Sequence, residues 1–257
     1  MDRNRRFDGR VAIVTGGSRG IGKGIAHGLA AEGAIVAVCS RDLATCEATA
    51  REIEATGGQA APYALDVTDY ASCETVVAAV VEELGRPTLL VNSAGISTER
   101  RRAEHHGVEA WDRTVGINLT GTYYMCRACA PQLLDGGGAV LNIGSTTARF
   151  ATPRIVAYGA SKAAVQHLTK TLGFEWADRG VRVNALDSGY VATDLSTPIL
   201  NVEKHAQTIV GATPMGRIAE LDEIVAPALF LLSDEASYVT GESFAVDGGM
   251  ATRGGPT

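Results

Sequence analysis

The sequence predicts an α/β fold, in which a doubly wound parallel sheet of seven strands carries helices on both faces. Three observations predict it. Seven short runs rich in Val, Ile and Leu recur along the chain, longer stretches with helical spacing of apolar residues separate them, and a glycine-rich segment, TGGSRGIG, follows the first run. Alternating strands and helices indicate a parallel sheet, and such a sheet is covered on both faces.

Each apolar run has the length and the β-branched content of a buried strand. The runs are VAIVTG (11–16), AIVAVCS (34–40), AAPYALDV (60–67), TLLVNSAG (88–95), GAVLNIGS (138–145), VRVNALDSG (181–189) and SFAVDGG (243–249). Ligands of such sheets bind beyond the carboxyl ends of the strands. We therefore expect the functional residues just after each strand.

The stretches between the runs have helical periodicity. GIAHGLAAEG, TCEATAREIEATGG and CETVVAAVVEELG show it, and each ends in glycine, as a helix C-cap often does. No low-complexity segment and no long Pro/Gly/Ser-rich linker divides the chain. We therefore expect a single domain over residues 1–257, with frayed tails at 1–7 and 251–257.

Composition argues against several classes of function. The chain has 257 residues, of which 46% are hydrophobic, so it can bury a large core. Its net charge of −6 gives no basic field to attract nucleic acid or an anionic membrane. The N-terminal MDRNRRFDGR lacks the apolar centre of a secretory signal, and no run is long enough to span a bilayer. We expect a cytoplasmic protein with small-molecule partners, no nucleic acid and no membrane.

The cysteines indicate reduced thiols, because their number is odd and a chain of this size folds without disulfides. They are Cys39, Cys46, Cys73, Cys126 and Cys129. Cys126 and Cys129 have a spacing seen in metal sites, but they lie in a helical pattern with no second pair of cysteines or histidines nearby. Packing in the core is favoured over ligation, and we predict no metal site.

The segment after the first strand is typical of a dinucleotide-binding loop. Gly16 permits a tight turn, Gly20 lets the backbone approach a pyrophosphate, and Gly22 lets the helix pack closely on the strand. The N-terminal amides of the following helix then point at the phosphates. Many loops are rich in glycine, but the position of this one between a strand and a helix favours a Rossmann-type domain.

The segment AYGASKAAVQHL places Tyr158 and Lys162 four residues apart, on one face of a helix. The pKa of free tyrosine is about 10, so acid–base chemistry near pH 7 requires a shift of about three units, or about 4 kcal/mol. An ammonium about 4 Å away, at an effective dielectric of about 20, supplies roughly that much. The pair is a candidate catalytic site, although a chance surface pair has the same spacing.

Three further matches extend this pattern. Ser145 closes a strand before Tyr158, NSAG (92–95) follows the fourth strand, and Asn118 lies in the helical pattern VGINLTG. Together with TGGSRGIG, these motifs resemble the short-chain dehydrogenase/reductase family over residues 8–250. The resemblance implies an NAD(P)-dependent enzyme that acts on CH–OH groups.

The resemblance also implies a role for each catalytic residue. Tyr158 is the general acid/base, and Ser145 hydrogen-bonds the carbonyl oxygen. Lys162 lowers the tyrosine pKa and holds the nicotinamide ribose, and Asn118 orders a proton-relay water. These roles are chemically sensible, because a carbonyl that receives hydride from the cofactor develops oxyanion charge that a serine hydroxyl and a tyrosine proton stabilise.

The resemblance further implies which residues bind the cofactor. Asp66 and Val67 would lie at the adenine edge, and Thr193 would contact the carboxamide. The expected cofactor-binding set is Gly16, Ser18, Arg19, Gly20, Ile21, Gly22, Ser40, Arg41, Asp66, Val67, Asn92, Ala94, Gly95, Tyr158, Lys162, Gly189, Val191 and Thr193. Asp66 has an alternative interpretation, as a residue at the N-terminus of the next helix.

Two segments depart from the usual family pattern. Ser93 stands where the usual NNAG has an asparagine, and a small polar residue there can still hydrogen-bond locally. Asp187-Ser188-Gly189 lacks the usual proline before the glycine. Because proline fixes φ, Ser188 is expected to make the loop over the nicotinamide more flexible. Asp187 is expected to place a charge near the cofactor.

The segment CSRD (39–42) bears on the choice of cofactor. A carboxylate about 20 residues past the glycine loop binds the ribose hydroxyls of NAD and repels a 2′-phosphate. Here Ser40 and Arg41 occupy that region, and Arg19 adds a second guanidinium that can bind phosphate. We predict NADP(H) rather than NAD, the alternative being that both arginines are solvated surface residues. Asp42 is expected to open the next helix.

The substrate site is expected in the loops 96–102, 146–153 and 190–214. Arg149 and Phe150 either bind an anionic or ring-bearing substrate or are simply solvated. The basic run Arg100-Arg101-Arg102, with His105 and His106 beside it, is either a surface face or a site for an anionic substrate such as an acyl carrier.

We therefore expect an NADP(H)-dependent oxidoreductase that interconverts a secondary alcohol and a ketone, with a 3-oxoacyl, polyol or related carbonyl substrate. The alternative is a cofactor-binding regulator or scaffold without turnover. The intact catalytic set argues against that alternative, because a silent binder needs none of it. The ending DGGM (247–250) resembles a family strand that packs against other subunits, which implies a homotetramer.

Overall fold

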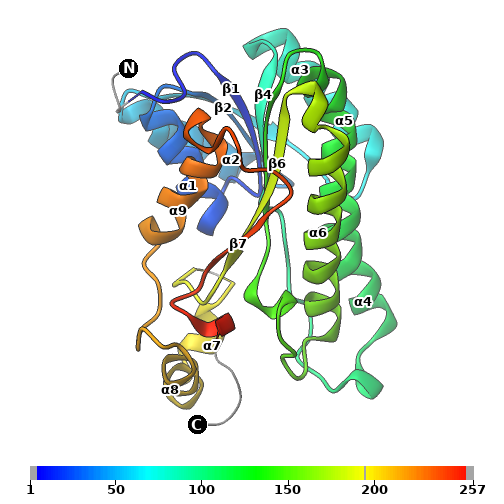
Figure 1. Cartoon of the computed structure of the whole chain (residues 1–257), viewed down its shortest axis with the longest axis vertical. Helices are drawn as coiled ribbons and strands as arrows, with labels where there is room; N and C mark the ends of the chain where they lie inside the picture. Colours follow the sequence, from blue (N-terminus) through cyan, green and yellow to red (C-terminus); the bar gives the residue numbers. More distant parts are fainter. Residues whose placement is uncertain (1–4, 194, 253–257) are drawn as a thin grey trace.

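The computed structural model describes residues 5–193 and 195–252, and these form one sheet of seven parallel strands (Figure 1). The strand order is β3-β2-β1-β4-β5-β6-β7. The strands are β1 (Val11–Thr15), β2 (Ile35–Ser40), β3 (Gln59–Ala64), β4 (Pro87–Asn92), β5 (Gly138–Ile143), β6 (Val181–Ser188) and β7 (Ser243–Val246). The predicted fold class and the seven predicted strands are confirmed.

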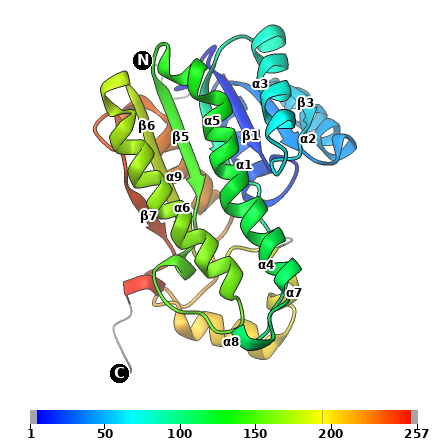
Figure 2. The same ribbon diagram turned by 90° about the vertical axis from the view of Figure 1, so that its right-hand side faces the viewer.

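Helices cover both faces of the sheet. They are α1 (Gly20–Ala31), α2 (Leu43–Ala55), α3 (Tyr70–Leu84), α4 (Val108–Val115), α5 (Gly121–Leu134), α6 (Val156–Glu175), α7 (Thr197–Leu200), α8 (Glu203–Ala212) and α9 (Asp222–Leu232). Helices α1, α2 and α9 pack on one face, and α3, α5 and α6 on the other (Figures 1 and 2). No helix in the described ranges combines the length and the hydrophobicity needed to cross a bilayer.

Each face of the sheet has its own apolar core, because successive strand residues point to opposite sides. Val14 and Val36 pack under α1 and α9, whereas Ile13, Ala37 and Leu90 pack under α3 and α5. Strands buried on both faces need apolar residues at every position, which explains why they appear in the sequence as continuous runs rather than as alternating patterns.

Two aspartates cap the helices that follow β2 and β3. The Asp42 side chain accepts a hydrogen bond from the Ala44 amide at 3.1 Å, at the start of α2. The Asp69 side chain accepts from the Ala71 amide at 3.0 Å, at the start of α3. The expectation that Asp42 opens a helix is confirmed. The helix-terminal alternative for Asp66 is wrong, because Asp69 is the cap.

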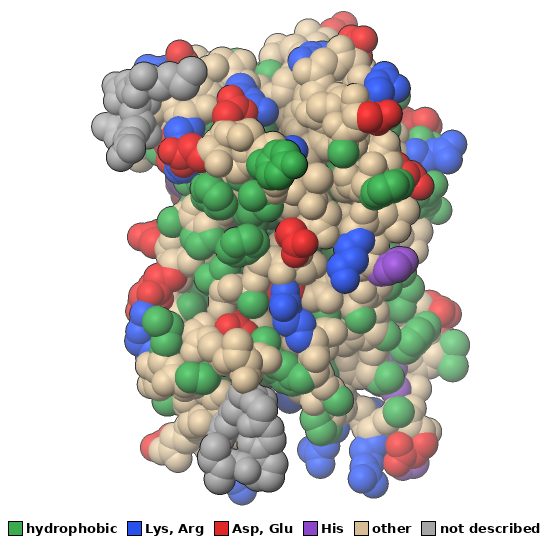
Figure 3. All heavy atoms as spheres, in the orientation of Figure 1, with side chains coloured by type: hydrophobic (Ala, Val, Ile, Leu, Met, Phe, Trp, Pro, Cys, Tyr) green, Lys and Arg blue, Asp and Glu red, His purple; other side chains and the backbone are tan. Residues whose placement is uncertain are grey.

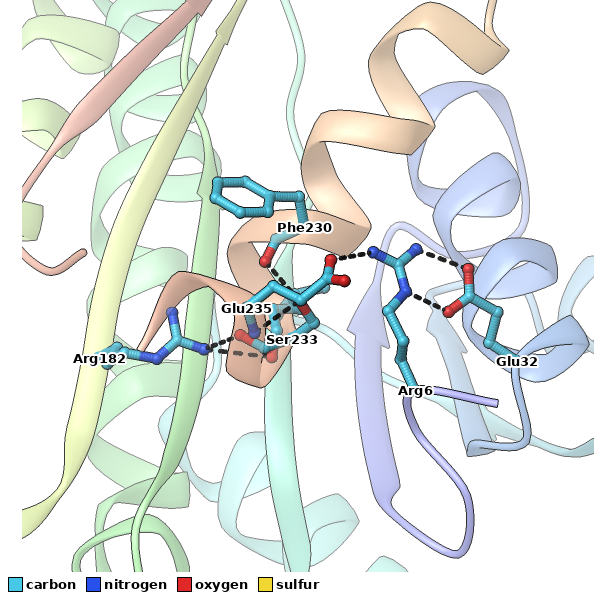
Figure 4. Close-up of polar contacts among 7 residues, drawn as sticks. Arg6, Glu32, Arg182, Phe230, Ser233 and Glu235 are labelled. Carbon is cyan, nitrogen blue, oxygen red and sulfur yellow. Dashed lines mark hydrogen bonds and ion pairs between the residues drawn. The ribbon is translucent and has the colours of Figure 1, made fainter. Parts of the chain in front are cut away.

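The N-terminal segment is attached to the body of the protein, as Figure 4 shows. Phe7 is fully buried, and the Arg6 guanidinium donates to Glu32 at 2.6 Å and to Glu235 at 3.1 Å. Fraying was expected over 1–7 and 251–257. It is not found for residues 5–7, which the core contact and the ion pairs hold, nor for 251–252, which lie in a short helical turn. Residues 1–4 and 253–257 lie outside the described residues.

The carboxyl end of α9 is anchored to β6 by Arg182 (Figure 4). Its guanidinium donates to the carbonyls of Leu231 at 2.7 Å and Ser233 at 2.8 Å. The last carbonyls of a helix lack intrahelical partners, so this side chain satisfies groups that the helix leaves open. Burial lowers the pKa of Arg182. The anchor fixes α9, which in turn packs against α1, the helix that follows the glycine loop.

Candidate active site

A deep cleft lies at the carboxyl ends of the strands, where the strand order reverses between β1 and β4. It encloses about 760 Å³. The hydroxyl of Thr15, at the end of β1, accepts hydrogen bonds from the amides of Ser93 at 3.1 Å and Ala94 at 3.2 Å, just past β4. The two strand ends are thereby held together. Open α/β sheets bind their ligands at this kind of reversal point.

The glycine loop forms one wall of the cleft. Gly16 has φ +63°, and a Cβ on it would lie 2.8 Å from the amide nitrogen of Ala94. A Cβ on Gly22 would lie 2.3 Å from the carbonyl oxygen of Gly16. Neither position has room for a side chain, so the loop needs glycine at both. Helix α1 begins at Gly20, and its N-terminus faces the cleft, where its amides suit a bound phosphate.

Polar and cationic groups line the end of the cleft beyond β2 and β3. Ser40 ends β2 and Arg41 follows it, Arg19 precedes α1, and none of the described residues accepts a hydrogen bond from either guanidinium. Asp66 Oδ1 accepts from the hydroxyl of Thr68 at 2.7 Å and from its amide at 2.9 Å. These bonds, with a smaller contribution from Arg41, lower the pKa of Asp66. The cleft therefore offers two guanidinium groups, Arg19 and Arg41, beside the carboxylates of Asp42 and Asp66.

Most of the residues expected to bind cofactor line this cleft. They are Gly16, Ser18, Arg19, Gly20, Ile21, Ser40, Arg41, Asp66, Val67, Ala94, Gly95, Tyr158, Lys162 and Thr193. Gly189 and Val191 line an adjoining cavity instead. Asn92 lines neither: it is buried, and its Nδ2 donates to Asn142 Oδ1 at 2.9 Å, which joins β4 to β5. Sequence reasoning missed Leu65 and Ile117 in the cleft wall, for which only their positions beside Asp66 and beside Asn118 gave a signal.

The structure brings Ser145 and Tyr158 to a second, smaller cavity of about 110 Å³. Gly144 separates Ser145 from the end of β5, and Tyr158 lies in the first turn of α6. The two cavities share Ile21, Ser97, Tyr158, Ser188, Thr193 and Leu195. A group bound in the larger cleft therefore meets a group bound in the smaller one at the tyrosine.

Asn118 lies in a π-helical turn (116–120) between α4 and α5. Its side chain accepts from the amide of Ile96 at 2.8 Å and donates to the carbonyl of Ile96 at 3.0 Å and to Ser161 Oγ at 3.1 Å. The sequence predicted an ordinary helix here. Single π turns often occur at functional sites, and this one aims an amide side chain at the segment after β4.

The electrostatics of Tyr158 and Lys162 differ from the sequence expectation. Burial raises the pKa of Tyr158, opposed by a hydrogen bond with Ser145, and burial lowers the pKa of Lys162 to about 8. The ammonium Nζ donates to the carbonyl of Ile143 at 2.6 Å and lies 5.8 Å from the centre of the tyrosine ring. The predicted lowering of the tyrosine pKa by Lys162 is not found, because burial affects both groups and the ammonium is turned toward a carbonyl.

The segment that departs from the family pattern is part of the sheet. Asp187 and Ser188 end β6, and Ser188 pairs with Val246 of β7. The flexibility expected of a loop therefore does not apply to Ser188. Asp187 is fully buried and pairs with Arg149, so its charge does not open into the cleft and Arg149 is neither simply solvated nor free to bind substrate.

Comparison with known proteins agrees with this geometry. A family model described as enoyl-(acyl carrier protein) reductase matches residues 16–251. The chain belongs to the short-chain dehydrogenase/reductase family. As a member, it is an NAD(P)-dependent dehydrogenase that acts on CH–OH groups, and the alternative of a scaffold without turnover is not retained.

Several family members resemble the whole chain. D-threitol dehydrogenase of Mycolicibacterium smegmatis is 40% identical over 254 residues, covering 98% of this chain and 97% of that protein. Galactitol 2-dehydrogenase (L-tagatose-forming) of Cereibacter sphaeroides is 41% identical over 247 residues, covering 95% and 96%. The crystal structure of a gluconate 5-dehydrogenase from Burkholderia cenocepacia, in complex with NADP and tartrate, superimposes with a TM-score of 0.94 at 32% identity, covering 98% and 99%.

The buried lysine of this dehydrogenase should cost stability at neutral pH. The Lys162 pKa falls from 10.5 to about 8, so burying the charged form costs about 3 kcal/mol, and the bond to Ile143 is worth about 1 kcal/mol. Because the folded-state pKa is the lower one, the cost is fully present below pH 8 and disappears as the pH rises toward 10.5. Lys162→Met should therefore be about 2 kcal/mol more stable than the wild type at pH 7.

The measurement is urea unfolding at pH 7 and at pH 10, at one protein concentration. Lys170→Met is the matched control, because Lys170 is an exposed lysine of the same helix. The stability advantage of Lys162→Met should shrink by pH 10, and the control should show no such change. An advantage equal at both pH values would mean that the lysine is not buried as a charge.

Proposed function

We propose that the chain, acting as one dinucleotide-binding and catalytic domain, is an NADP(H)-dependent dehydrogenase that interconverts a secondary alcohol of a polyol and the corresponding ketone. One observation carries this proposal: nine residues with hydroxyl side chains line the smaller cavity. They are Ser97, Ser145, Thr146, Thr147, Tyr158, Ser188, Tyr190, Thr193 and Ser196. Each hydroxyl both donates and accepts hydrogen bonds, so this lining is complementary to a chain of carbinol groups.

The other proposed substrate classes fit this cavity less well. A 3-oxoacyl chain is mostly alkyl and gains little from a lining of hydroxyl groups. Apolar side chains such as Ile155 and Ile199 also line the cavity, where they can contact the carbon backbone of a polyol, and Arg100 adds one cationic side chain. Two similar proteins are named as dehydrogenases of threitol and galactitol, which supports the same substrate class.

The catalytic roles follow from the groups around Tyr158. A bound nicotinamide cofactor supplies hydride to the ketone, or accepts it from the alcohol. Ser145 hydrogen-bonds the substrate oxygen, and Tyr158 donates a proton to it in reduction and removes the proton in oxidation. Burial raises the tyrosine pKa, so the proton-donating form predominates at neutral pH and oxidation is favoured at alkaline pH. Lys162 holds the nicotinamide ribose, and Asn118 orders the water that relays the proton.

The cleft fits a dinucleotide with a 2′-phosphate. The loop at Gly16 and Gly22 has no room for side chains, which leaves its backbone open to a pyrophosphate. Arg41 and Arg19 supply positive charge where a carboxylate would favour NAD. A similar dehydrogenase has been crystallised in complex with NADP, which supports the same cofactor here.

We also propose that the enzyme is a cytoplasmic homotetramer. Figure 3 shows hydrophobic side chains gathered over the α9 and β7 region of one face. Phe174, Tyr238 and Phe244 are large exposed hydrophobic residues, as are Trp111 and Tyr123 on α4 and α5. Exposed aromatic residues of this kind are enriched at subunit interfaces. Five unpaired, buried cysteines agree with a reducing compartment.

A substrate panel tests the proposed substrate class. We expect kcat/KM to be highest for polyols of four to six carbons, and at least about tenfold above that of 2-butanol, because the latter leaves the cavity hydroxyls unpaired. The measurement is NADPH formation at pH 9 across tetritols, hexitols, 2-butanol and cyclohexanol, with 3-oxoacyl thioesters in the reverse direction. A preference for the thioesters would contradict the polyol proposal.

Tyr158→Phe tests the proposed acid–base residue. The change removes the transferable proton and little volume, so kcat should fall by about a hundredfold or more while NADPH affinity changes little. Steady-state kinetics and a fluorescence titration of NADPH measure the two effects. Tyr123→Phe, an exposed tyrosine of α5, should behave as the wild type. Retention of more than about a tenth of wild-type turnover would remove Tyr158 from this role.

Arg41→Ala tests the phosphate contact. If the guanidinium binds a 2′-phosphate, NADPH affinity should fall about ten- to a hundredfold, and NADH affinity should hardly change. Ser40→Asp combined with Arg41→Ala should prefer NADH, and added salt should weaken wild-type NADPH binding more than NADH binding. Calorimetric titration of both cofactors gives the comparison, with Arg51→Ala as the matched surface control. Equal losses for both cofactors would show that Arg41 does not contact the phosphate.

A further inference from the structure

A half-buried ion pair, formed by Asp187 and Arg149, lies next to the backbone that precedes Ser145. Asp187 of β6 is 0% exposed, and its Oδ2 accepts from Arg149 Nε at 2.8 Å and from Gln166 Nε2 at 2.5 Å. Arg149 follows the short turn after β5, and Gln166 lies on α6. The guanidinium of Arg149 also donates to the carbonyl of Ser243, on β7. This cluster of Asp187, Arg149 and Gln166 connects four elements through one carboxylate.

The carboxylate contacts the backbone next to Ser145. A Cβ placed on Gly144 would lie only 2.0 Å from Asp187 Oδ1, so the aspartate fills the place that a side chain at that position would take. The amide of Gly144 donates to the carbonyl of Leu186 at 2.8 Å, which continues the pairing of β5 with β6. Asp187 therefore fixes the position of the backbone that leads into Ser145.

Arg149 fixes the other end of the same turn. The amide of Ala148 donates to the carbonyl of Ser145 at 3.0 Å, and the amide of Arg149 donates to the carbonyl of Thr146 at 2.9 Å. Ser145 and Arg149 are thus the two ends of one hydrogen-bonded turn. Because Asp187 contacts both ends, a shift of the carboxylate moves the serine.

The same cluster holds the catalytic helix. Tyr158, Lys162 and Gln166 are spaced four residues apart, so they lie along one face of α6. Lys162 donates to the carbonyl of Ile143 on β5, and Gln166 donates to Asp187 on β6. The helix is therefore attached to β5, whose end precedes Ser145, and to the neighbouring strand β6.

An ion pair in this place is not explained by stability alone. Burying a carboxylate is costly, and well-packed apolar residues of similar size often stabilise a fold as well or better. Burial raises the pKa of Asp187, against the opposing effect of Arg149, which indicates that the fold keeps a charge where it is unfavourable. Buried, perturbed groups of this kind are found preferentially at functional sites.

We propose that Asp187, held by Arg149 and Gln166, is a positioning residue that sets the distance from Ser145 to Tyr158 at which both reach the substrate oxygen. The inference rests on the proposed roles of these two residues. Asp187 touches neither substrate nor cofactor in this arrangement and acts through the Ser145 turn and through α6.

The negative charge of Asp187 also has an electrostatic effect, on the pKa of Tyr158, that can be measured separately from its effect on geometry. The charged and titratable groups that face Asp187 are Arg149 from the turn and Tyr158 and Lys162 from α6, with Tyr190 beside the tyrosine. Asp187 raises the pKa of Tyr158 and that of Lys162. Alcohol oxidation needs the deprotonated tyrosine, so its rate rises with pH. Removing the charge lowers the tyrosine pKa and moves this rise to lower pH.

The test compares Asp187→Asn, Arg149→Ala, Arg149→Lys and the Asp187→Asn/Arg149→Ala double variant of the full chain. Each is assayed for polyol oxidation over pH 6–11, for NADPH affinity and for Tm. We expect kcat to fall about tenfold or more in Asp187→Asn and in Arg149→Ala, with no more than about a threefold further loss in the double variant, because coupled residues act through one contact. Arg149→Lys should recover part of the lost activity. Asp187→Asn should shift the rise of the oxidation rate with pH to lower pH. NADPH affinity should stay within about twofold.

Two controls keep the outcomes distinct. Arg51→Ala removes an exposed ion pair with Glu47 and should leave the kinetics unchanged. Ser145→Ala reports on the proposed catalytic role of Ser145: if it keeps polyol turnover, that role fails whatever Asp187 does. If Ser145→Ala is inactive while Asp187→Asn and Arg149→Ala match the wild type, only the positioning role is overturned. The positioning role is also overturned if the variants lose activity only in proportion to losses of Tm and NADPH affinity, and the pH dependence of oxidation is unchanged. Because the Arg149 side chain is 34% exposed, its variants remain informative even if Asp187→Asn does not fold.

Discussion

Two backbone segments approach each other so closely at the ends of β1 and β4 that no side chain fits between them. Gly16 faces the amide of Ala94, and the Thr15 hydroxyl binds the amides of Ser93 and Ala94. This contact fixes the glycine loop relative to the strand that carries the cofactor wall. Since the chain turns to opposite faces of the sheet after these strands, the same contact creates the cleft. The same backbone contact therefore determines both the packing of the sheet and the shape of the ligand site.

The site also contains charged side chains whose burial in the protein is energetically unfavourable. Lys162 and Asp187 are both buried. Burial lowers the pKa of the lysine and raises that of the aspartate, so in both cases it favours the uncharged form. Each is held by groups from neighbouring elements, the carbonyl of Ile143 for the lysine and Arg149 for the aspartate. A lone buried charge would be expelled or neutralised. Rigid partners keep Lys162 and Asp187 in place. The arrangement around Tyr158 is therefore fixed, at a cost in folding stability.

The sequence predicted the features that depend on local pattern and did not predict those that depend on distant contacts. Strands appear as apolar runs because both faces of the sheet are covered, and Asp42 was recognisable as a cap from its place before a helix. The π turn at Asn118 has no local signature. The pair of Arg149 and Asp187 joins residues 38 positions apart, so neither position alone indicated it. The pKa of Tyr158 also depends on burial, which spacing along a helix does not report.

The shape of the two cavities explains how one domain serves both cofactor and substrate. They meet at Tyr158, with Ser188 and Thr193 in the shared wall. Because Ser188 belongs to β6 and pairs with β7, part of this wall is a strand end rather than a loop. A strand end holds a hydroxyl more firmly than a loop does, since its backbone is already hydrogen-bonded on the sheet. Groups held in this way are preorganised, and the energy of closing a loop is not needed to align them.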